Sequence, residues 1–341
     1  MDVARLVAKR MLMAVPTLMG VIILTFILSN LLPGDPALVR LGSSVVEEEA
    51  LEALRHAMGV DQPIHVQFAL YIKRLARFDL GFSWTTGHSV NYDLLQRFPA
   101  TFELVSISMI VAIIVAIPLA VISATRHGRA VDHLARGFAI LGLATPVFWT
   151  GLAGILIFSF FLKWLPLPTG RLALMMTPPT KITGMYVLDS ILTGNWETLG
   201  SAIAHLVLPV CALAYSCIAT ILRLTRSSML EVLRQNYIRT ARAKGVERAR
   251  VNWIHALRNS LLATVTGLGL TFGQLLGGAI VVEAVFALPG MGRYAVQAIR
   301  NLDYSAIQGF ILVTAVVFIV INLLTDIVYV LIDPAIRYGR E

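Results

Sequence analysis

The hydrophobic positions of this chain gather in six long runs. They cover about residues 11–32, 104–124, 137–162, 202–222, 261–288 and 307–332. A helix needs about 20 apolar residues to cross a bilayer, and each run comes to about that length. The first run follows Arg5, Lys9 and Arg10 and is not followed by a small-residue cleavage pattern, so we expect it to be retained as a span. We therefore predict an all-α integral membrane protein with six transmembrane helices.

Composition and charge agree with a membrane protein. The chain has 341 residues, 57% hydrophobic and 14% charged, whereas soluble domains carry about 25% charged residues. The net charge of +8 does not indicate nucleic-acid binding, because the lysines and arginines follow the expected topology. With the N-terminus inside, the inner segments hold 17 of the 28 basic residues, although they are the shorter segments. This bias predicts that both termini are cytosolic.

Residues 33–99 separate the first span from the rest and are predicted to lie outside the membrane. Pro33 to Pro36 form a turn signal, and Ser44 with Glu47 has capping-box spacing. Two amphipathic helices are expected, one ending at Gly59 and one following Pro63. These helices either lie on the membrane surface or form a docking face for an external partner. Residues 163–200 are rich in proline and glycine, so we expect no long helix there.

Residues 223–258 form a basic segment between the fourth and fifth spans. Nine of its 36 residues are lysine or arginine. Ser228 and Glu231 have the spacing of a helix start, and Gly245 interrupts the apolar stripe. We predict a helix, a glycine turn and a second helix, with small residues at the bend. Such a bend can enter a cleft on another protein, where its arginines pair with carboxylates. The alternative is a basic helix resting on anionic lipid.

The sequence lacks several signatures of enzymes. No lysine follows a glycine, so there is no Walker A loop for ATP, and neither a G-x-S-x-G nor an H-E-x-x-H motif occurs. No two histidines stand four residues apart, and Cys211 and Cys217 should point to different faces of one helix. We therefore expect no catalytic residue, no bound metal or cofactor and no disulfide.

Several short strings resemble one known family. TARAKG at 240–245, with HALRN at 255–259, resembles the EAA loop of the membrane subunits of bacterial ABC importers. PGDP, MGVDQP, DLGFS, PGMGR, LDY and DPAIRYG follow the order of the dipeptide, oligopeptide and nickel permease family, at 33–36, 58–63, 79–83, 289–293, 302–304 and 333–339. The closest likeness is to its B-type subunits for dipeptides or glutathione. Arg239 replaces the usual first Glu, and Ala263 replaces a proline common in peptide permeases.

The resemblance implies a type I permease fold in the bacterial inner membrane. It implies a permease that imports dipeptides or short oligopeptides, pairs with a C-type permease, and receives substrate from a periplasmic or lipid-anchored binding protein. Two cytosolic ATPases would bind ATP and Mg²⁺ and hold one loop of each permease. Glutathione, nickel chelates or another small solute are alternative substrates, and an ATP-independent channel is a more distant alternative. The expected parts are a tail and first span at 1–32, a periplasmic helical region at 33–99 and a permease core at 100–341.

The resemblance also identifies the residues that would contact the ATPases. They are Thr240, Ala241, Arg242, Ala243, Lys244 and Gly245.

Two further features lie within the predicted spans. Gly269, Gly273 and Gly277 form a face on which another helix can approach closely, either within the subunit or from the partner permease. Glu283 and Asp326 should face protein or water, because a charge in the bilayer core costs at least about 2.5 kcal/mol. Glu283 either pairs with Arg293 and holds the PGMGR turn or binds a peptide's ammonium group. We expect Asp326 to pack helices together.

Overall fold

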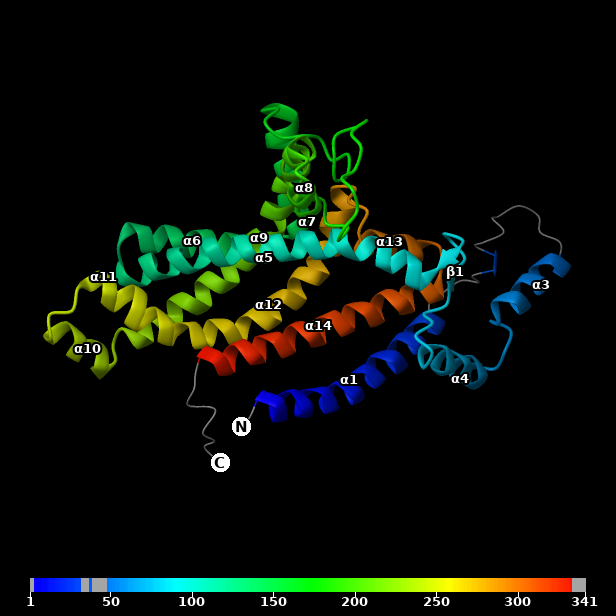
Figure 1. Ribbon diagram of the computed structural model, residues 1–341, viewed down its shortest axis with the longest axis horizontal. Coiled ribbons are helices and arrows are strands. Elements are labelled where there is room, and N and C mark those ends of the chain that lie inside the picture. Colours follow the sequence, from blue (N-terminus) through cyan, green and yellow to red (C-terminus); the bar gives the residue numbers. More distant parts are fainter. Residues whose placement is uncertain (1–2, 32–36, 39–47, 333–341) are drawn as a thin grey trace.

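The computed structural model describes residues 3–31, 37–38 and 48–332 as an elongated helical protein (Figure 1). The predicted turn at 33–36, the Ser44–Glu47 cap and the string at 333–339 lie outside these residues. The elements of the first half are α1 (Val3–Leu31), α3 (Glu48–Met58), α4 (Ile64–Leu75), β1 (Phe82–Ser83), β2 (His88–Ser89), α5 (Val90–Thr125), α6 (Ala130–Ala144), α7 (Val147–Gly154) and the π-helix η1 (Ile155–Phe161). The elements of the second half are α8 (Tyr186–Thr193), α9 (Trp196–Val232), α10 (Asn236–Ala243), α11 (Arg248–Arg250), the π-helix η2 (Val251–Ala256), α12 (Leu257–Val285), α13 (Met291–Arg300) and α14 (Tyr304–Ile332).

The core lies between α5, α9 and α12. Ala112, Ala116 and Ala120 follow one another at helical spacing on α5 and are fully buried, together with Leu213 on α9 and Leu275 on α12. Small side chains let helix backbones approach closely, which favours association where the surrounding lipid is as apolar as the helices. The spans α14 and α1 pack beside this core, with α1 outermost against α14 (Figure 1). Both cysteines of α9 are free thiols, Cys211 exposed and Cys217 buried.

The third predicted span is not one straight helix. Among the described residues, five helices are long and apolar enough to cross a membrane, and a sixth crossing requires the pair formed by α6 and α7 with η1. This pair is bent by 105° between Ala144 and Val147. Thr145 is extended, with φ −90° and ψ 123°, and it precedes Pro146. Proline disfavours the helical conformation in the preceding residue and has no N–H to donate, so the helix must break here. The third predicted span, 137–162, is therefore a bent pair of helices and not one straight helix.

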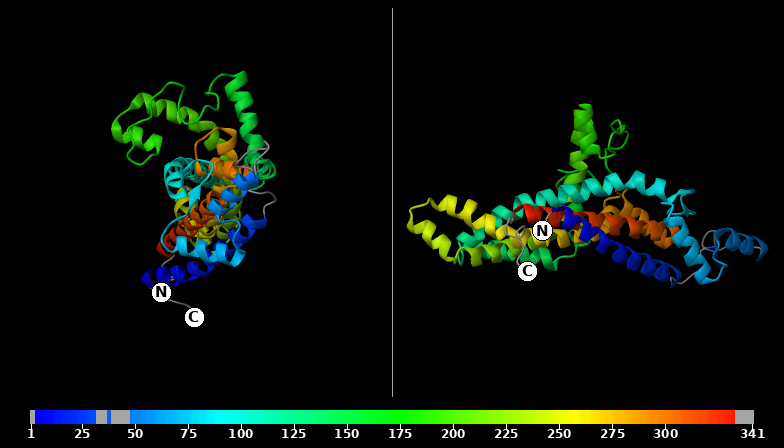
Figure 2. Two further views of the ribbon diagram at one scale, coloured as in Figure 1. Left: turned by 90° about the vertical axis from the view of Figure 1, so that its right-hand side faces the viewer. Right: turned by 60° about the horizontal axis from the view of Figure 1, so that its bottom comes forward.

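Residues 147–200 form an arm that projects from the long helices. Both views of Figure 2 show it in green, at a steep angle to the main body. Its helix α8 has eight residues, as expected for a proline-rich segment. The arm carries large hydrophobic side chains that the bundle leaves exposed, among them Phe148, Trp149, Leu156, Phe160, Phe161 and Trp164.

Two buried carboxylates hold the arm together and fix it to α5. Asp189 accepts hydrogen bonds from the backbone N–H groups of Ile182, Thr183 and Gly184. Burial would raise the pKa of Asp189, but hydrogen bonds from Thr183 and from these amides hold that pKa below its ordinary value. Glu103 on α5 accepts from the Val187 N–H at 2.7 Å. Glu103 also pairs with Arg171 at 2.7 Å, so the arm has a defined position.

The region outside the spans has the two predicted amphipathic helices, α3 and α4. Gly59 follows α3 with a left-handed φ of 67°, which glycine adopts without strain. The helix α4 is anchored on the first span, because Phe26 of α1 lies 5.1 Å from the ring of Phe68 and 5.9 Å from that of Tyr71. The first span and this outer region therefore form one packed unit.

The basic segment begins inside α9. This helix runs without interruption to Val232, so the helix start predicted at Ser228 is wrong. The buried face of α9 continues through Leu222, Thr225 and Met229. The Thr225 hydroxyl lies 2.8 Å from that of Thr264 on α12. Because this face remains buried against neighbouring helices, α9 continues as one helix to Val232.

Candidate coupling hairpin and transport-path residues

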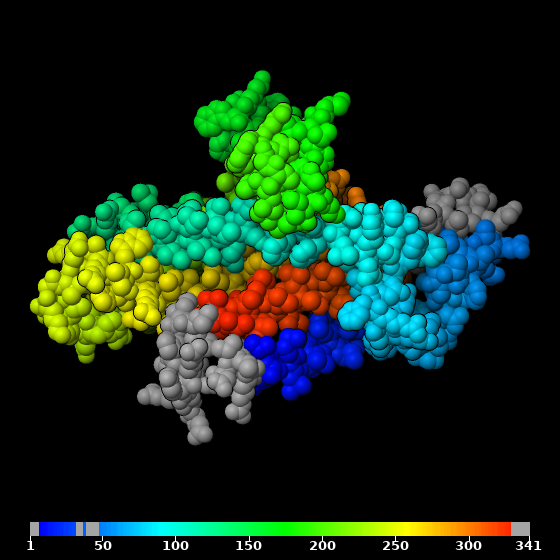
Figure 3. Space-filling model, in the orientation of Figure 1, coloured from blue at the N-terminus to red at the C-terminus, as the bar shows by residue number. Residues whose placement is uncertain are grey.

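The segment 223–258, here called the coupling hairpin, lies at one end of the long axis of the molecule. In Figure 3 it forms the yellow end, opposite α3 and α4. It consists of the end of α9, then α10, a turn at Gly245, α11 and η2. Ile238 of α10 is fully buried against Val121, Met229 and Val251. This contact fixes α10 to the ends of α5, α9 and η2.

The predicted contact residues lie at the tip of the coupling hairpin. Five of the six are exposed: Thr240, Arg242, Ala243, Lys244 and Gly245. Ala241 is half-buried and packs against the buried cluster that contains Ile238. The structure therefore brings all six residues together around one turn. Their side chains extend from a base whose position is set by Ile238.

Gly245 closes the turn after α10. Its N–H donates to the Arg242 carbonyl at 3.0 Å, and its φ is 77°. A Cβ on Gly245 would have no atom within 4 Å. The glycine is therefore required by the left-handed backbone and not by lack of space within the subunit. The bend predicted at Gly245 is confirmed.

A second anchor of the coupling hairpin was not predicted. Asn259 at the start of α12 donates to the Tyr237 hydroxyl at 2.7 Å, which joins α10 to the fifth span. Asn259 is the last residue of the HALRN string. Its role could not be read from spacing, because the two residues lie 22 positions apart.

An ion pair at the base of the coupling hairpin was also missed. Arg226 of α9 donates through Nε to Asp132 Oδ1 at 2.7 Å and through Nη2 to Asp132 Oδ2 at 2.9 Å. The Asp132 side chain is fully buried, and that of Arg226 is 15% exposed. Ser123 of α5 and the Gly128 N–H also donate to this carboxylate. Three helices, α5, α6 and α9, are thus tied together by one buried carboxylate.

Glu283 lies at the opposite end of the spans and holds the turn after α12. Its carboxylate is 1% exposed. It accepts from the Thr101 hydroxyl at 2.5 Å and from the Arg293 backbone N–H at 3.0 Å. The Arg293 guanidinium instead donates to the Ala287 carbonyl at 2.9 Å. The expected pairing of Glu283 with Arg293 therefore exists as a hydrogen bond from the Arg293 backbone N–H and not as an ion pair. Through this bond the carboxylate caps the first turn of α13.

The glycines of the PGMGR string make this cap possible. A Cβ on Gly290 would collide with the Glu283 carboxyl group. A Cβ on Gly292 would lie 2.5 Å from the Ile280 Cα atom. The Met291 N–H donates to the Thr101 hydroxyl at 2.8 Å, which extends the network to α5. The string therefore wraps a backbone turn closely around one buried acid.

The three glycines of α12 divide into two groups. A Cβ on Gly269 would lie 2.5 Å from Asn322 Oδ1, and one on Gly273 would lie 2.6 Å from Phe318. Both positions therefore allow α14 to pack closely within the subunit. A Cβ on Gly277 would meet no atom within 4 Å, and Gly277 lines an apolar cavity beside α14. Gly277 alone of the three is free for contacts outside the subunit.

Asp326 joins the first and last spans. Arg10 of α1 donates through Nη2 to Asp326 Oδ1 at 2.9 Å, and its Nε lies 2.7 Å from Oδ2. The pairing of α1 with α14 explains how an acidic residue is tolerated in this helix. Asn322, one turn before Asp326, contacts α12 at Gly269.

Among the described residues, no group of three or more His, Cys, Asp or Glu side chains is placed to hold a metal ion.

Two protein-family models match the chain. The description of the first is "Binding-protein-dependent transport system inner membrane component", and it matches residues 116–338. The second describes the N-terminal part of such components and matches residues 3–105. The chain belongs to this family. It is a multi-pass membrane permease subunit.

Curated relatives match the permease over nearly its whole length. The probable D,D-dipeptide transport system permease protein DdpB of Escherichia coli (strain K12) is 43% identical over 320 residues, 94% of each chain. The di/tripeptide transport system permease protein DppB of Pseudomonas aeruginosa (strain UCBPP-PA14) is 40% identical, over 98% of this chain and 99% of the relative. The dipeptide transport system permease protein DppB of Alkalihalophilus pseudofirmus is 42% identical, over 97% and 98%.

Removal of the buried acid at the base of the coupling hairpin should destabilise the permease. Asp132→Ala leaves Arg226 without its partner, which should cost about 3 kcal/mol. The thermal unfolding midpoint of the purified protein measures this loss. Arg136→Gln is the matched control, because Arg136 is 45% exposed and lies 3.9 Å from the same carboxylate. It should cost less than about 1 kcal/mol. Equal midpoints for the two variants would contradict the assignment.

Glu283 should lose less stability on replacement by an amide than on truncation. Glu283→Ala leaves the Thr101 hydroxyl and the Arg293 N–H without an acceptor, at about 1–3 kcal/mol for each buried group. Glu283→Gln keeps one acceptor oxygen, which can serve only one of these two donors, and should lose about half as much. Thermal unfolding of both variants distinguishes these outcomes. A Gln variant as unstable as the Ala variant would show that the charge, and not the cap geometry, is required.

Proposed function

We propose that the chain is the membrane-spanning subunit of an ATP-driven importer for dipeptides or short oligopeptides. The names of the relatives support the substrate class, because the three proteins are named as D,D-dipeptide, di/tripeptide and dipeptide permeases. The observation that carries the coupling mechanism is the coupling hairpin. It combines an anchored base with an exposed tip at Thr240–Gly245.

Coupling would proceed through two cytosolic ATPase subunits, one of which receives the tip of this hairpin. Ile238, Tyr237 and Asn259 connect the hairpin to the spans, so displacement of the tip moves α9 and α12 with it. ATP and Mg²⁺ would bind to the ATPases. In this proposal the chain is not an enzyme, has no catalytic residue and holds no cofactor of its own.

A second, C-type permease would complete the transport path. The exposed hydrophobic side chains of the arm can contact lipid or such a partner subunit, because most of them lie in the third predicted span. The arm is held rigidly to α5 by Glu103. Such a preformed surface can bind a partner without a large ordering cost.

The proposed orientation places both termini and the coupling hairpin in the cytosol of a bacterial cell. The basic residues of the hairpin and of the loop between α5 and α6 support it. Residues 33–99 then face the periplasm, where a soluble or lipid-anchored peptide-binding protein would deliver substrate. The proposed parts of the chain remain 1–32, 33–99 and 100–341.

Subunit packing is the role that we propose for Gly269, Gly273, Glu283 and Asp326. Each contacts another part of the same chain in the ways described above. Gly277 has open space beside it and is the candidate for contact outside the subunit.

Gly245 tests the coupling hairpin. Gly245→Leu places a branched side chain at a left-handed position on the contact surface and should abolish peptide uptake without removing the protein from the membrane. Gly128→Leu is the matched control, because Gly128 is also exposed, with the same φ of 77° and no atom within 4 Å of a Cβ. Both substitutions should cost about 1–2 kcal/mol of backbone strain. Loss of uptake in both variants, or in neither, would refute a specific coupling role.

Charge reversal tests the ATPase partners. Purification through this subunit should recover two ATPases and a second permease. Arg242→Glu with Lys244→Glu should weaken ATPase recovery about tenfold, as expected for the loss of charge-assisted contacts. Arg126→Glu with Arg129→Glu makes the same charge change in the exposed loop between α5 and α6 and should leave recovery unchanged. If the hairpin binds lipid instead, ATPase recovery will be the same in both double variants.

A further inference from the structure

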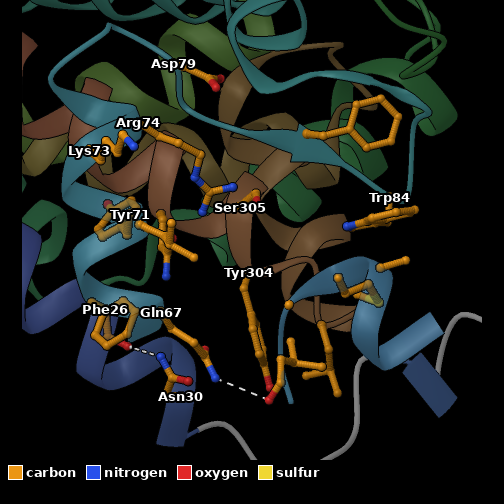
Figure 4. A pocket seen from close by; sticks show the side chains of 18 of the residues that line it. Phe26, Asn30, Gln67, Tyr71, Lys73, Arg74, Asp79, Trp84, Tyr304 and Ser305 are labelled. Carbon is orange, nitrogen blue, oxygen red and sulfur yellow. Dashed lines mark hydrogen bonds between the residues drawn. The ribbon is translucent and has the colours of Figure 1, made fainter. Parts of the chain in front are cut away.

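A cavity of about 520 Å³ lies at the end of the molecule opposite the coupling hairpin. Its walls come from the end of α1, from α3 and α4, from the β-hairpin and from the start of α14 (Figure 4). Phe26, Tyr71, Trp84 and Tyr304 supply aromatic surface. The cavity therefore lies where the first and last spans leave the membrane.

The polar lining of this cavity is cationic. Lys73, Arg74 and Arg77 line it together with one carboxylate, Asp79. Asp79 Oδ1 accepts from the Gly81 N–H at 2.9 Å. Within the part of the chain that the structure describes, none of the three cations forms an ion pair with a carboxylate. The cavity thus has an excess of positive charge that no described residue neutralises.

Arg74 extends toward Ser305 in this cavity (Figure 4). A Cβ on Gly81 would lie 3.4 Å from Arg74 Nη1 and 3.1 Å from Ser305 Oγ, so these two donors lie on the same side of Gly81. A guanidinium and a hydroxyl in this arrangement can both donate to the oxygens of one phosphate. No described carboxylate pairs with this guanidinium.

Tyr71 adds a buried hydroxyl to the lining. Its residue is 3% exposed, and the hydroxyl has no hydrogen-bond partner among the described residues. Burial raises the pKa of Tyr71 to about 12, so the hydroxyl remains protonated at neutral pH. A buried polar group without a partner is uncommon in native proteins and is consistent with a site that a polar ligand completes.

The face of α14 that borders this cavity continues into apolar surroundings. Tyr304 and Gln308 line the first cavity, and Ile311, Ala315 and Phe318 follow at helical spacing. These last three line a second cavity of about 410 Å³, whose other walls come from Val21 of α1 and from α12. A cationic site and an apolar groove thus follow one another along α1 and α14.

We propose that these two cavities bind one anionic phospholipid, with its phosphate beside Arg74 and an acyl chain along the face of α14. A soluble anion would need the first cavity alone. A lipid also explains the second cavity, because an apolar groove at membrane depth is filled by hydrocarbon. The surface of α1 beside the site is exposed and apolar at Leu24, Ile27 and Leu28, so a lipid can enter from the bilayer. This inference does not depend on the transported substrate.

Lipid binding to the full-length permease, purified in detergent, tests the proposal. Phosphatidylglycerol and phosphatidylcholine are titrated separately, and bound lipid is measured by native mass spectrometry. Phosphatidylglycerol should bind more tightly, and Arg74→Gln should weaken its binding about fivefold, the equivalent of ~1 kcal/mol for one cation near an anionic lipid. Arg300→Gln is the matched control, since Arg300 is exposed at the end of α13 and outside the cavity. The Arg300→Gln variant should bind phosphatidylglycerol as tightly as the unsubstituted permease.

A second variant tests the acyl-chain groove. Ala315→Phe fills the second cavity and should also weaken phosphatidylglycerol binding, while leaving the cationic site intact. Displacement of bound lipid by inorganic phosphate or by a dipeptide would mean that the first cavity recognises a soluble anion, and would overturn the proposal. Equal lipid binding by the Arg74→Gln and Arg300→Gln variants would overturn it as well. Arg74→Lys, which keeps the positive charge, should bind phosphatidylglycerol more tightly than Arg74→Gln.

Discussion

Buried carboxylates that accept backbone and side-chain hydrogen bonds hold this permease together. A polar group without a partner is costly in a protein interior and more costly in lipid, so every break between long helices requires acceptors. Asp132 supplies them between α5 and α6, Asp189 within the arm, and Glu283 before α13. Asp303 accepts from the Ser83 hydroxyl at 2.7 Å and thus ties the start of α14 to the β-hairpin. Asp132, Glu283 and Asp303 each fix a turn relative to a span, and Asp189 fixes a turn within the arm.

This arrangement determines which parts of the molecule can transmit movement. The coupling hairpin has a base held by Ile238, Asn259 and the Arg226–Asp132 pair, whereas its tip is exposed. A force on the tip therefore acts on α9 and α12 as whole helices. At the opposite end, the Glu283 network connects α12 to α5 and α13. The span α12 thus connects the coupling hairpin at one end to the turn before α13 at the other.

Much of this organisation could be predicted from the sequence. The long apolar runs, the amphipathic helices α3 and α4 and the turn at Gly245 depend on local patterns that tertiary contacts do not change. The bend at Pro146 was not predicted, although proline is a local signal for a helix break. The prediction used only the length of the apolar run around Pro146. The pairings of Asp132 with Arg226 and of Ser83 with Asp303 could not be predicted, since the partners are 94 and 220 residues apart. Ser83 and Asp303 lie in the family motifs DLGFS and LDY, but the motifs do not show that these two residues are in contact.

The sequence by itself determined that the chain crosses a membrane, where its long apolar runs lie and which family it resembles. These properties follow from the length and period of its hydrophobic runs and from short motifs. Only the tertiary structure decided that Glu283 caps α13, that Gly269 and Gly273 touch α14 while Gly277 borders an apolar cavity, and that Arg74 lines a cavity with three cations. The physical reason is that a side chain's partner depends on which helices are neighbours. That neighbourhood is set by packing between segments far apart in the chain.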